Sequence, residues 1–247
     1  GWRMEIDVIG TRYFDKTAAI GRMDGASEMD DPYDIPSLPS LSNSLRLKMD
    51  IGSNGMYAHS SDMRSNDEFN GVWNMQVQGN DEPGPIRLSV SSMIGIPIDL
   101  KFAIIDVPNR DVIMNFPQKE LIIENKIEDA YDVILIGGQE SYVLQMIDDI
   151  LADIPEEYSL GQNYPNPFNP TTKIDFALPR TGDVSLVIYN LMGQQVRTLL
   201  AKNMEYGFHT ITWNGLDQSG RPVSSGVYFS ELRARSFRQT KKMLMLK

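Results

Sequence analysis

Residues 163–172 read NYPNPFNPTT, and three of these ten positions, 165, 167 and 170, are proline. Proline fixes the backbone φ angle at about −65°, donates no backbone hydrogen bond and moves the preceding residue toward extended geometry. The stretch therefore cannot form a helix and makes a poor central strand. It leads straight into TKIDFAL at 172–178, where polar and apolar side chains alternate as they do in a strand. We interpret residues 163–172, called the proline segment below, as the rigid start of a second domain.

The net charge changes sign near the same place. Residues 1–157 hold 12 Lys+Arg and 28 Asp+Glu, a net charge of −16, whereas residues 158–247 hold 11 and 5, a net charge of +6. This change supports a domain boundary. We expect an acidic module at 1–147, an acidic and then proline-rich linker at 148–170, and a second module at 171–247. An acidic first module argues against nucleic acid as a partner.

The composition is that of a globular protein with no membrane span. With 247 residues, of which 41% are hydrophobic and 23% charged, the chain can bury one large core or two modest ones. No apolar run approaches the roughly 20 residues that span a bilayer, so we expect no transmembrane segment. Cysteine is absent, which excludes disulfides and a cysteine nucleophile. The chain begins without a methionine or a signal peptide, and we interpret it as the C-terminal piece of a longer exported precursor; the alternative is a complete small protein that lost its methionine.

Short strands separated by turn signals dominate the first module and predict an antiparallel β-sandwich. The run 142–151 is ambiguous, because its apolar residues would also suit a short helix, but we favour a strand. The strands that we expect are Arg3–Ile9, Ser44–Asp50, Gly71–Gln78, Ile86–Ser92, Ile98–Ile105, Asp111–Asn115, Glu120–Glu124, Tyr131–Ile136 and Ser141–Ile147.

The second module has clean alternation and predicts a small immunoglobulin-like sandwich of about seven strands, so that the fold class of the whole chain is all-β. The expected strands are Thr172–Leu178, Asp183–Tyr189, Gln195–Leu200, Gly207–Trp213, Pro222–Val223 as a hairpin arm, Gly226–Arg235 and Gln239–Leu246. We expect Trp213 to anchor the core, Asp217–Gly220 to form a tight turn, and Gly226 to relieve crowding where the chain returns to the sheet.

Three stretches of the second module together resemble a known family. LGQNYPNPFNPTTKIDFALP at 160–179, WNGLDQSGRPVSSGVYF at 213–229 and KKMLMLK at 241–247 resemble the type A C-terminal sorting domain of bacterial type IX secretion cargo. That domain is related to the immunoglobulin-like domain of flagellar hook-cap scaffolding proteins. The resemblance covers 158–247 and implies a secretion and surface-attachment signal, with the outer-membrane secretion machinery of a Gram-negative-type bacterium as partner. The residues that carry it are Asn163, Pro165, Asn166, Pro167, Phe168, Asn169, Pro170, Trp213, Gly215, Gly226 and Lys247.

The first module is similar to a β-sandwich that precedes sorting domains in other exported proteins. The similarity rests on DPYDIP at 31–36, SDMR at 61–64 and Trp73. It implies a non-enzymatic module for assembly, adhesion or glycan contact in a secreted or cell-surface protein. The alternatives are an accessory domain of a hydrolase that lies upstream, and a subunit of a self-assembling filament or hook-cap-like scaffold. Opposite charges on the two modules could pair neighbouring chains, although we favour a monomeric, surface-tethered tail.

Few residues suggest chemistry. The loop 24–42 is acidic, and calcium, which takes six to eight oxygen ligands, is the one cofactor that we consider there, against a solvated loop. The triad that could be imagined around His59 is not expected, because triads join residues far apart in sequence and need an oxyanion hole. We expect His209 at the surface or on an edge strand, and the aromatic residues Trp2, Trp73, Tyr57 and Tyr131 in the core rather than on a sugar-stacking face. We therefore expect no enzyme; the calcium candidates are Asp24, Glu28, Asp30, Asp31 and Asp34.

Overall fold

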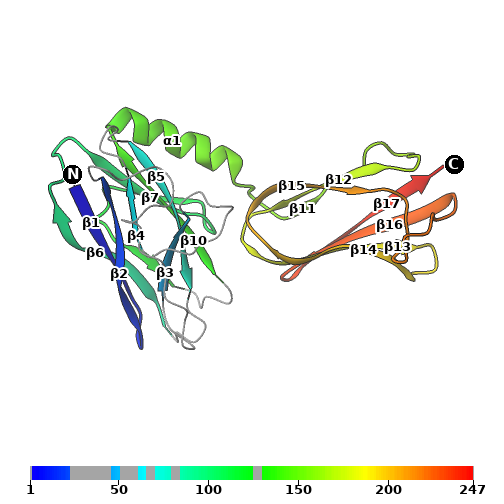
Figure 1. The fold of residues 1–247 in the computed structure, drawn as a ribbon, viewed down its shortest axis with the longest axis horizontal. Helices are drawn as coiled ribbons and strands as arrows, with labels where there is room; N and C mark the ends of the chain where they lie inside the picture. Colours follow the sequence, from blue (N-terminus) through cyan, green and yellow to red (C-terminus); the bar gives the residue numbers. More distant parts are fainter. Residues whose placement is uncertain are drawn as a thin grey trace. The chain divides into compact units, whose positions relative to one another are not determined.

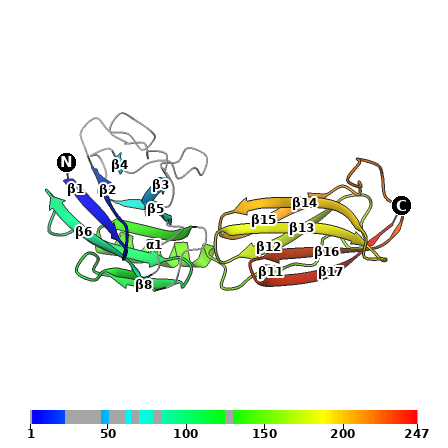
Figure 2. The same ribbon diagram turned by 90° about the horizontal axis from the view of Figure 1, so that it is seen from below.

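The computed structural model describes residues 2–22, 46–50, 61–64, 70–78, 84–124 and 130–246. The chain divides into two compact units, Gly1–Leu151 (unit 1) and Ala152–Lys247 (unit 2). Each unit contains two β-sheets, which Figures 1 and 2 show from two directions. The predicted all-β fold class is confirmed, and within the described ranges no helix is long and apolar enough to cross a membrane.

Unit 1 is built from two five-stranded sheets. The first has the strand order β4-β2-β1-β6-β9, with bounds β1 Trp2–Ile9, β2 Phe14–Arg22, β4 Ser61–Arg64, β6 Ile86–Ile94 and β9 Leu121–Ile123. The second has the order β3-β5-β10-β7-β8, with bounds β3 Arg46–Asp50, β5 Gly71–Gln78, β7 Lys101–Asp106, β8 Asp111–Met114 and β10 Tyr131–Gly138. Neighbouring strands are antiparallel, except that β2 and β4 are parallel.

The two sheets of unit 1 enclose one core that contains both of its tryptophans. The ring of Trp2 meets Trp73 edge to face with centroids 6.0 Å apart, and it meets Phe102 at 5.6 Å. Because Trp2 and Trp73 are buried, the alternative of a sugar-stacking face on these residues is wrong. The hydroxyl of Tyr131 is bound to a buried carboxylate, and Tyr57 lies outside the described residues.

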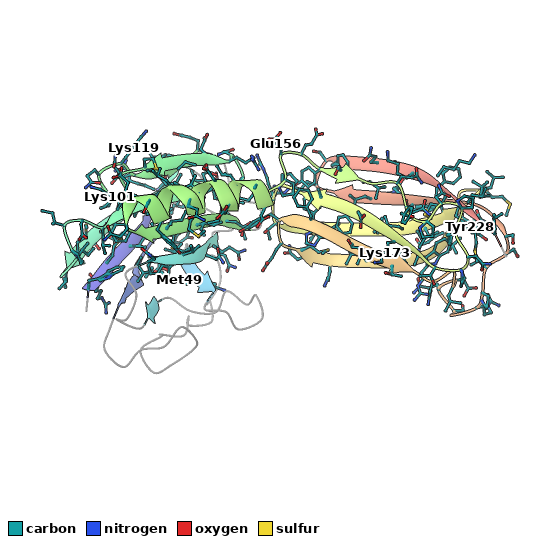
Figure 3. All side chains as sticks on the ribbon, turned by 90° about the horizontal axis from the view of Figure 1, so that it is seen from above. Met49, Lys101, Lys119, Glu156, Lys173 and Tyr228 are labelled. Carbon is teal, nitrogen blue, oxygen red and sulfur yellow. The ribbon has the colours of Figure 1, made fainter. Side chains whose placement is uncertain are left out.

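The one helix of the described residues, α1 (Glu140–Asp153), accompanies the second sheet of unit 1. Ile134 and Ile136 of β10 are buried on the face opposite to the core, so this sheet needs cover on both faces. Figures 1 and 3 show α1 lying along the sheet, and Val143 and Ile147 are its buried residues. The predicted strand at 141–147 is therefore wrong, because the apolar spacing follows the helical period that suits this cover.

Most other strands of unit 1 are confirmed within a few residues, but two were missed. Strand β2 has only a short apolar core, Ala18–Ile20, and alanine is a weak strand former. Strand β4 has four residues and pairs in parallel with β2, a partner that is distant in sequence. Neither strand carries a local pattern that distinguishes it from a loop.

Unit 2 is a sandwich of a three-stranded and a four-stranded sheet that share one core. The first sheet has the order β11-β12-β15, with bounds β11 Ser159–Leu160, β12 Thr172–Leu178 and β15 Gly207–Trp213. The second has the order β14-β13-β16-β17, with bounds β13 Gly182–Asn190, β14 Gln195–Met204, β16 Gly226–Ala234 and β17 Phe237–Met245. All neighbouring strands are antiparallel.

The predicted strands of unit 2 agree with these bounds within two residues, except that β14 continues four residues beyond the predicted end at Leu200, and there are two further differences. Residues 222–223 make only an isolated bridge, between Pro222 and Leu216, and β11 was not predicted. His209 lies in the edge strand β15, as expected, and its ring stacks on Phe176. Residues 148–153 of the expected linker belong to α1, and the proline segment pairs with strands of unit 2.

Candidate functional site: the proline segment and the last strand

The proline segment connects the first long strand of unit 2 to the last. Tyr164 and Lys173 exchange two backbone hydrogen bonds, each of 2.9 Å. Farther along, the backbone N–H of Phe168 donates to the carbonyl oxygen of Leu244 at 3.0 Å, and the N–H of Leu246 donates to the carbonyl oxygen of Phe168 at 2.9 Å. Two motifs from opposite ends of the resembling stretch therefore form one hydrogen-bonded element.

Asn163 organises the start of this segment. Its side chain is 2% exposed, and its Nδ2 donates to the carbonyl oxygen of Pro165 at 3.0 Å and to Oγ1 of Thr172 at 2.9 Å. Oγ1 of Thr172 donates in turn to the same carbonyl at 2.9 Å, and Nε2 of Gln162 donates to Oδ1 of Asn163 at 2.7 Å. Because proline has no N–H to offer, these side chains hold a segment that backbone bonds alone could not fix.

Further side chains attach the segment to β17. Oδ1 of Asn166 accepts a hydrogen bond from the backbone N–H of Leu244 at 2.9 Å. Just before the segment, Nε2 of Gln162 donates to the carbonyl oxygen of Lys242 at 2.8 Å. The edge of the last strand is thus covered by the proline segment, which leaves fewer backbone groups open to pairing with another chain.

An aromatic cluster anchors the segment in the core. Phe168 and Trp213 are buried with ring centroids 5.4 Å apart, and Trp213 meets Tyr228, labelled in Figure 3, edge to face at 5.3 Å. Nε1 of Trp213 donates to the carbonyl oxygen of Leu216 at 3.0 Å. The predicted role of Trp213 as core anchor is confirmed, and its immediate partner is a residue of the proline segment.

Of two glycines in the resembling stretch, one lies where a side chain would clash and the other does not. Gly215 has φ of 70°, and a Cβ there would lie 2.9 Å from the carbonyl oxygen of Pro170, so the turn and the proline segment approach too closely for a side chain. A Cβ at Gly226 would meet no atom within 4 Å. The expectation that Gly226 relieves crowding is therefore wrong.

The tight turn predicted at Asp217–Gly220 is confirmed. The backbone N–H of Gly220 donates to the carbonyl oxygen of Asp217 at 3.0 Å. Oδ1 of Asp217 accepts from the backbone N–H groups of Arg221 and Ser219, both at 2.9 Å. The bond from Arg221 is the main reason that the pKa of Asp217 is lowered.

The outward face of β16 carries a buried carboxylate between two arginines. Glu231 is bonded to Arg233 and to Arg238, each at 2.6 Å, and both arginine side chains are more than half exposed. Burial alone would raise the pKa of Glu231, but the hydrogen bonds from Arg238 and Arg233 lower it below its ordinary value. These basic residues of the last two strands are therefore fixed in place rather than freely solvated.

The predicted site residues differ in where the structure places them. Within the proline segment, Pro165, Asn166, Pro167, Asn169 and Pro170 are exposed, and the peptide bonds before Pro165 and Pro167 are cis. Lys247, His59 and the calcium candidates, Asp24, Glu28, Asp30, Asp31 and Asp34, lie outside the described residues. Across the ranges that are described, no three His, Cys, Asp or Glu side chains lie close enough to hold a metal ion.

Three contributors to the site were not predicted. Gln162 and Thr172 complete the hydrogen bonds around Asn163, and Oε1 of Gln239 accepts from the backbone N–H of Leu160 at 2.7 Å. Polar residues that flank a proline-rich stretch are a usable signal for the first two, since a segment with few donors needs side-chain partners. No comparable signal marks Gln239, whose partner is far away in sequence.

Comparison with known proteins agrees with the fold of unit 2. A family model described as the FlgD Ig-like domain matches residues 163–236. Together with the two-sheet topology, this match shows an immunoglobulin-like sandwich. No curated protein matches the chain.

Two solved structures from Porphyromonas gingivalis are similar to the chain at a low level. PorZ, described as an essential bacterial surface component of the type-IX secretion system, is 13% identical with a TM-score of 0.28, over 71% of this chain and 21% of PorZ. Dimeric latent PorU is 9% identical with a TM-score of 0.32, over 100% of this chain and 20% of PorU. The chain thus spans about a fifth of either protein.

Proposed function

We propose that unit 2 is a sorting signal that the type IX secretion machinery of the outer membrane recognises in its folded form. Unit 1 would be cargo of that signal, a non-catalytic β-module that is displayed at the cell surface or released from a Gram-negative-type bacterium. The resemblance of 158–247 to sorting domains suggests this role, and the immunoglobulin-like fold of unit 2 is compatible with it.

The observation that carries the proposal is the direct pairing of the proline segment with β17. A linear signal would need its motif residues close together in sequence. Here Phe168 and Leu244 bond through their backbones, and Asn166 bonds to Leu244 through its side chain. A receptor that contacts this element would therefore read folded structure, and it would meet both ends of the domain at one place.

Within the same element, buried and exposed motif residues suggest a division of roles. Asn163 and Phe168 are buried and hold the fold, whereas Pro167, Asn169 and Pro170 are exposed. Exposed residues that do little for stability are the natural contacts for a partner. We assign recognition to these exposed positions.

Unit 1 is proposed as non-catalytic because its buried carboxylates hold strands together. Oδ2 of Asp15 accepts from the backbone N–H of Leu47 at 3.0 Å, across the two sheets. The carboxylate of Asp106 accepts from the hydroxyl of Tyr131 at 2.8 Å. Carboxylates used in this way stabilise a sandwich, and a module of this kind suits contact, adhesion or assembly.

The test is export of the full chain from its native precursor in a host with a type IX system, and in the same host without it. Surface and periplasmic protein are quantified by fractionation. We expect display only when the system is present, and loss of display after deletion of residues 239–247. Normal display of the deleted protein would refute the proposal.

Because the deletion removes β17 and part of the core, a second variant separates recognition from folding. Asn169→Ala changes an exposed residue of the proline segment, and Thr212→Ala is its matched control on the exposed face of β15. We expect Asn169→Ala to reduce display while the protein stays folded, and Thr212→Ala to have no effect. Equal display of the two variants would remove Asn169 from the recognised surface.

A further inference from the structure

Unit 2 presents two large apolar side chains at the turn between β13 and β14. Leu191 is 73% exposed and Met192 is 78% exposed. Turns between strands usually carry polar residues or glycine, since they face solvent. Two adjacent apolar side chains at such a position remain mostly in solvent and are suited to contact with a partner.

Hydrogen bonds make this turn rigid. Oδ1 of Asn190 accepts from the backbone N–H groups of Met192 and Gln194, both at 3.0 Å. The N–H of Gly193 donates to the carbonyl oxygen of Asn190 at 3.0 Å, and Gly193 has φ of 75°. The apolar tip is therefore held in one shape before any partner arrives, which lowers the entropy cost of binding.

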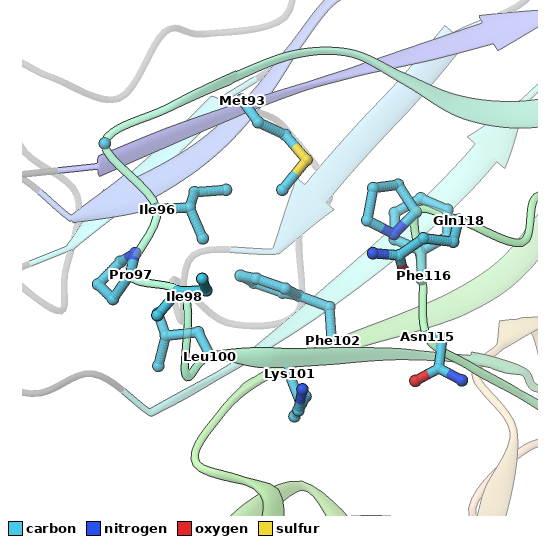
Figure 4. Close-up of a pocket in the computed structure, with 12 residues that line it drawn as sticks. Met93, Ile96, Pro97, Ile98, Leu100, Lys101, Phe102, Asn115, Phe116 and Gln118 are labelled. Atoms are coloured by element: carbon cyan, nitrogen blue, oxygen red, sulfur yellow. The ribbon is translucent and has the colours of Figure 1, made fainter.

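Unit 1 contains a cavity of about 630 Å³ that opens between β6 and β7, with both polar and apolar groups in its lining. Figure 4 shows Met93, Ile96 and Phe102 directed toward the hollow from different segments, and Lys101 also belongs to its lining. At the rim, Ile98 is 100% exposed and Met93 is 45% exposed. The volume falls in the range of about 300–1,000 Å³ that takes a small ligand, so it has room for two side chains.

We propose that the Leu191–Met192 turn of one chain inserts into this cavity of a second copy. The side chains of Leu191 and Met192, called the knob below, are apolar and exposed on a rigid turn, and the cavity offers the exposed apolar side chains of Met93 and Ile98 at its rim. The opposite charges of the two parts of the chain, −16 for residues 1–157 and +6 for residues 158–247, steer the encounter. The contact does not depend on the proposed role in export.

The geometry of this contact sets the kind of assembly. A surface of unit 2 meets a different surface of unit 1, so the interface is heterologous and each chain offers one knob and one cavity. Such contacts add chains one after another, as a ring or an open filament. Because two side chains make an interface well below the roughly 1,200 Å² of stable complexes, association is weak and appears only at high protein concentration.

Two variants disable one partner surface each. Leu191→Ser with Met192→Ser removes the knob and keeps Asn190, so the turn itself is retained. Ile98→Asp places a charge at the cavity rim, at a fully exposed position where folding is not affected. The matched control is Phe208→Ser, which removes a side chain of similar exposure, 68%, from another part of unit 2.

Sedimentation velocity over a concentration series measures the association of each variant, and circular dichroism confirms that each is folded. We expect the wild type and Phe208→Ser to associate beyond dimers, and each disabled variant alone to stay monomeric. An equimolar mixture of the two disabled variants keeps one intact knob and one intact cavity, so it should form 1:1 dimers and nothing larger. A monomeric wild type at every concentration, or a mixture that stays monomeric, would overturn the proposal.

Discussion

Replacing Asn163 by alanine tests whether side chains hold the proline segment in place. Asn163 is buried and takes part in three hydrogen bonds, with Pro165, Thr172 and Gln162. Asn163→Ala removes all three bonds without adding bulk or charge. The backbone of the segment has few donors of its own, so little else can take over their role.

The expected loss of unfolding free energy follows from the number of hydrogen bonds that Asn163→Ala removes. A net intramolecular hydrogen bond contributes about 1 kcal/mol, and a buried group left unpaired costs about 1–3 kcal/mol. Pro165 keeps its bond from Thr172, and the exposed amide of Gln162 can turn to water, so neither is stranded. We therefore expect unit 2 to lose about 2–3 kcal/mol, a large share of the about 5–15 kcal/mol that stabilises a domain.

Hydrogen exchange of the slowest amides of β13 in the full chain measures this loss, because those amides exchange only on unfolding of their unit. A loss of 2–3 kcal/mol corresponds to exchange that is faster by about 30- to 150-fold. The control is Asn169→Ala in the same segment, whose exposed side chain should change exchange less than about threefold. If both variants exchange equally, the buried hydrogen bonds of Asn163 do not hold the segment, and the reasoning is refuted.

Two more predictions concern the same unit. Phe168→Ala should cost about 3–5 kcal/mol by the same exchange measurement, because it empties the buried space beside Trp213; a cost below about 1 kcal/mol would contradict the packing. Glu231→Gln should lower stability at neutral pH, because hydrogen bonds from Arg238 and Arg233 hold the pKa of Glu231 below its ordinary 4.5. Because its pKa is lower in the folded chain, the Glu231 carboxylate stabilises the fold above pH 4.5, and this contribution is lost as the pH falls below 4.5. In urea titrations, the difference in unfolding free energy between wild type and Glu231→Gln should therefore shrink with acid. A difference that grew with acid would contradict the prediction.

Alternation predicted the strands of the fold wherever one face is buried and the other exposed. Strands β5, β12 and β15 have the expected bounds, since each presents side chains of period two to a single core. The pattern fails for α1, because its short apolar run suits the period of a strand as well as that of a helix. The helix is favoured because the second sheet of unit 1 has a buried face that needs cover, which local sequence does not indicate. It also fails for β2, whose apolar core is short, and for β4, which has four residues and pairs in parallel with a strand that is distant in sequence.

The site was predictable in outline and not in detail. The motifs that contain Phe168, Trp213 and Leu244 could be picked out by resemblance, but their mutual contact follows from the sandwich topology. Sequence alone could not predict that Asn163 is buried and Asn169 exposed. Both are asparagines close to a proline: Asn169 precedes Pro170 directly, and one residue separates Asn163 from Pro165. Burial depends on the path of the segment across β12 and β17, which only the structure shows.

Transfer of unit 2 to an unrelated protein tests the central claim most directly. Residues 152–247 are appended to a periplasmic fluorescent reporter in a bacterium with a type IX system, and surface fluorescence is compared with that of the reporter carrying residues 152–238. The proposal predicts that the complete unit sends the reporter to the cell surface or the medium and that the shortened unit leaves it in the periplasm. A reporter that remains in the periplasm with the complete, folded unit attached would contradict the claim that unit 2 is a sorting signal.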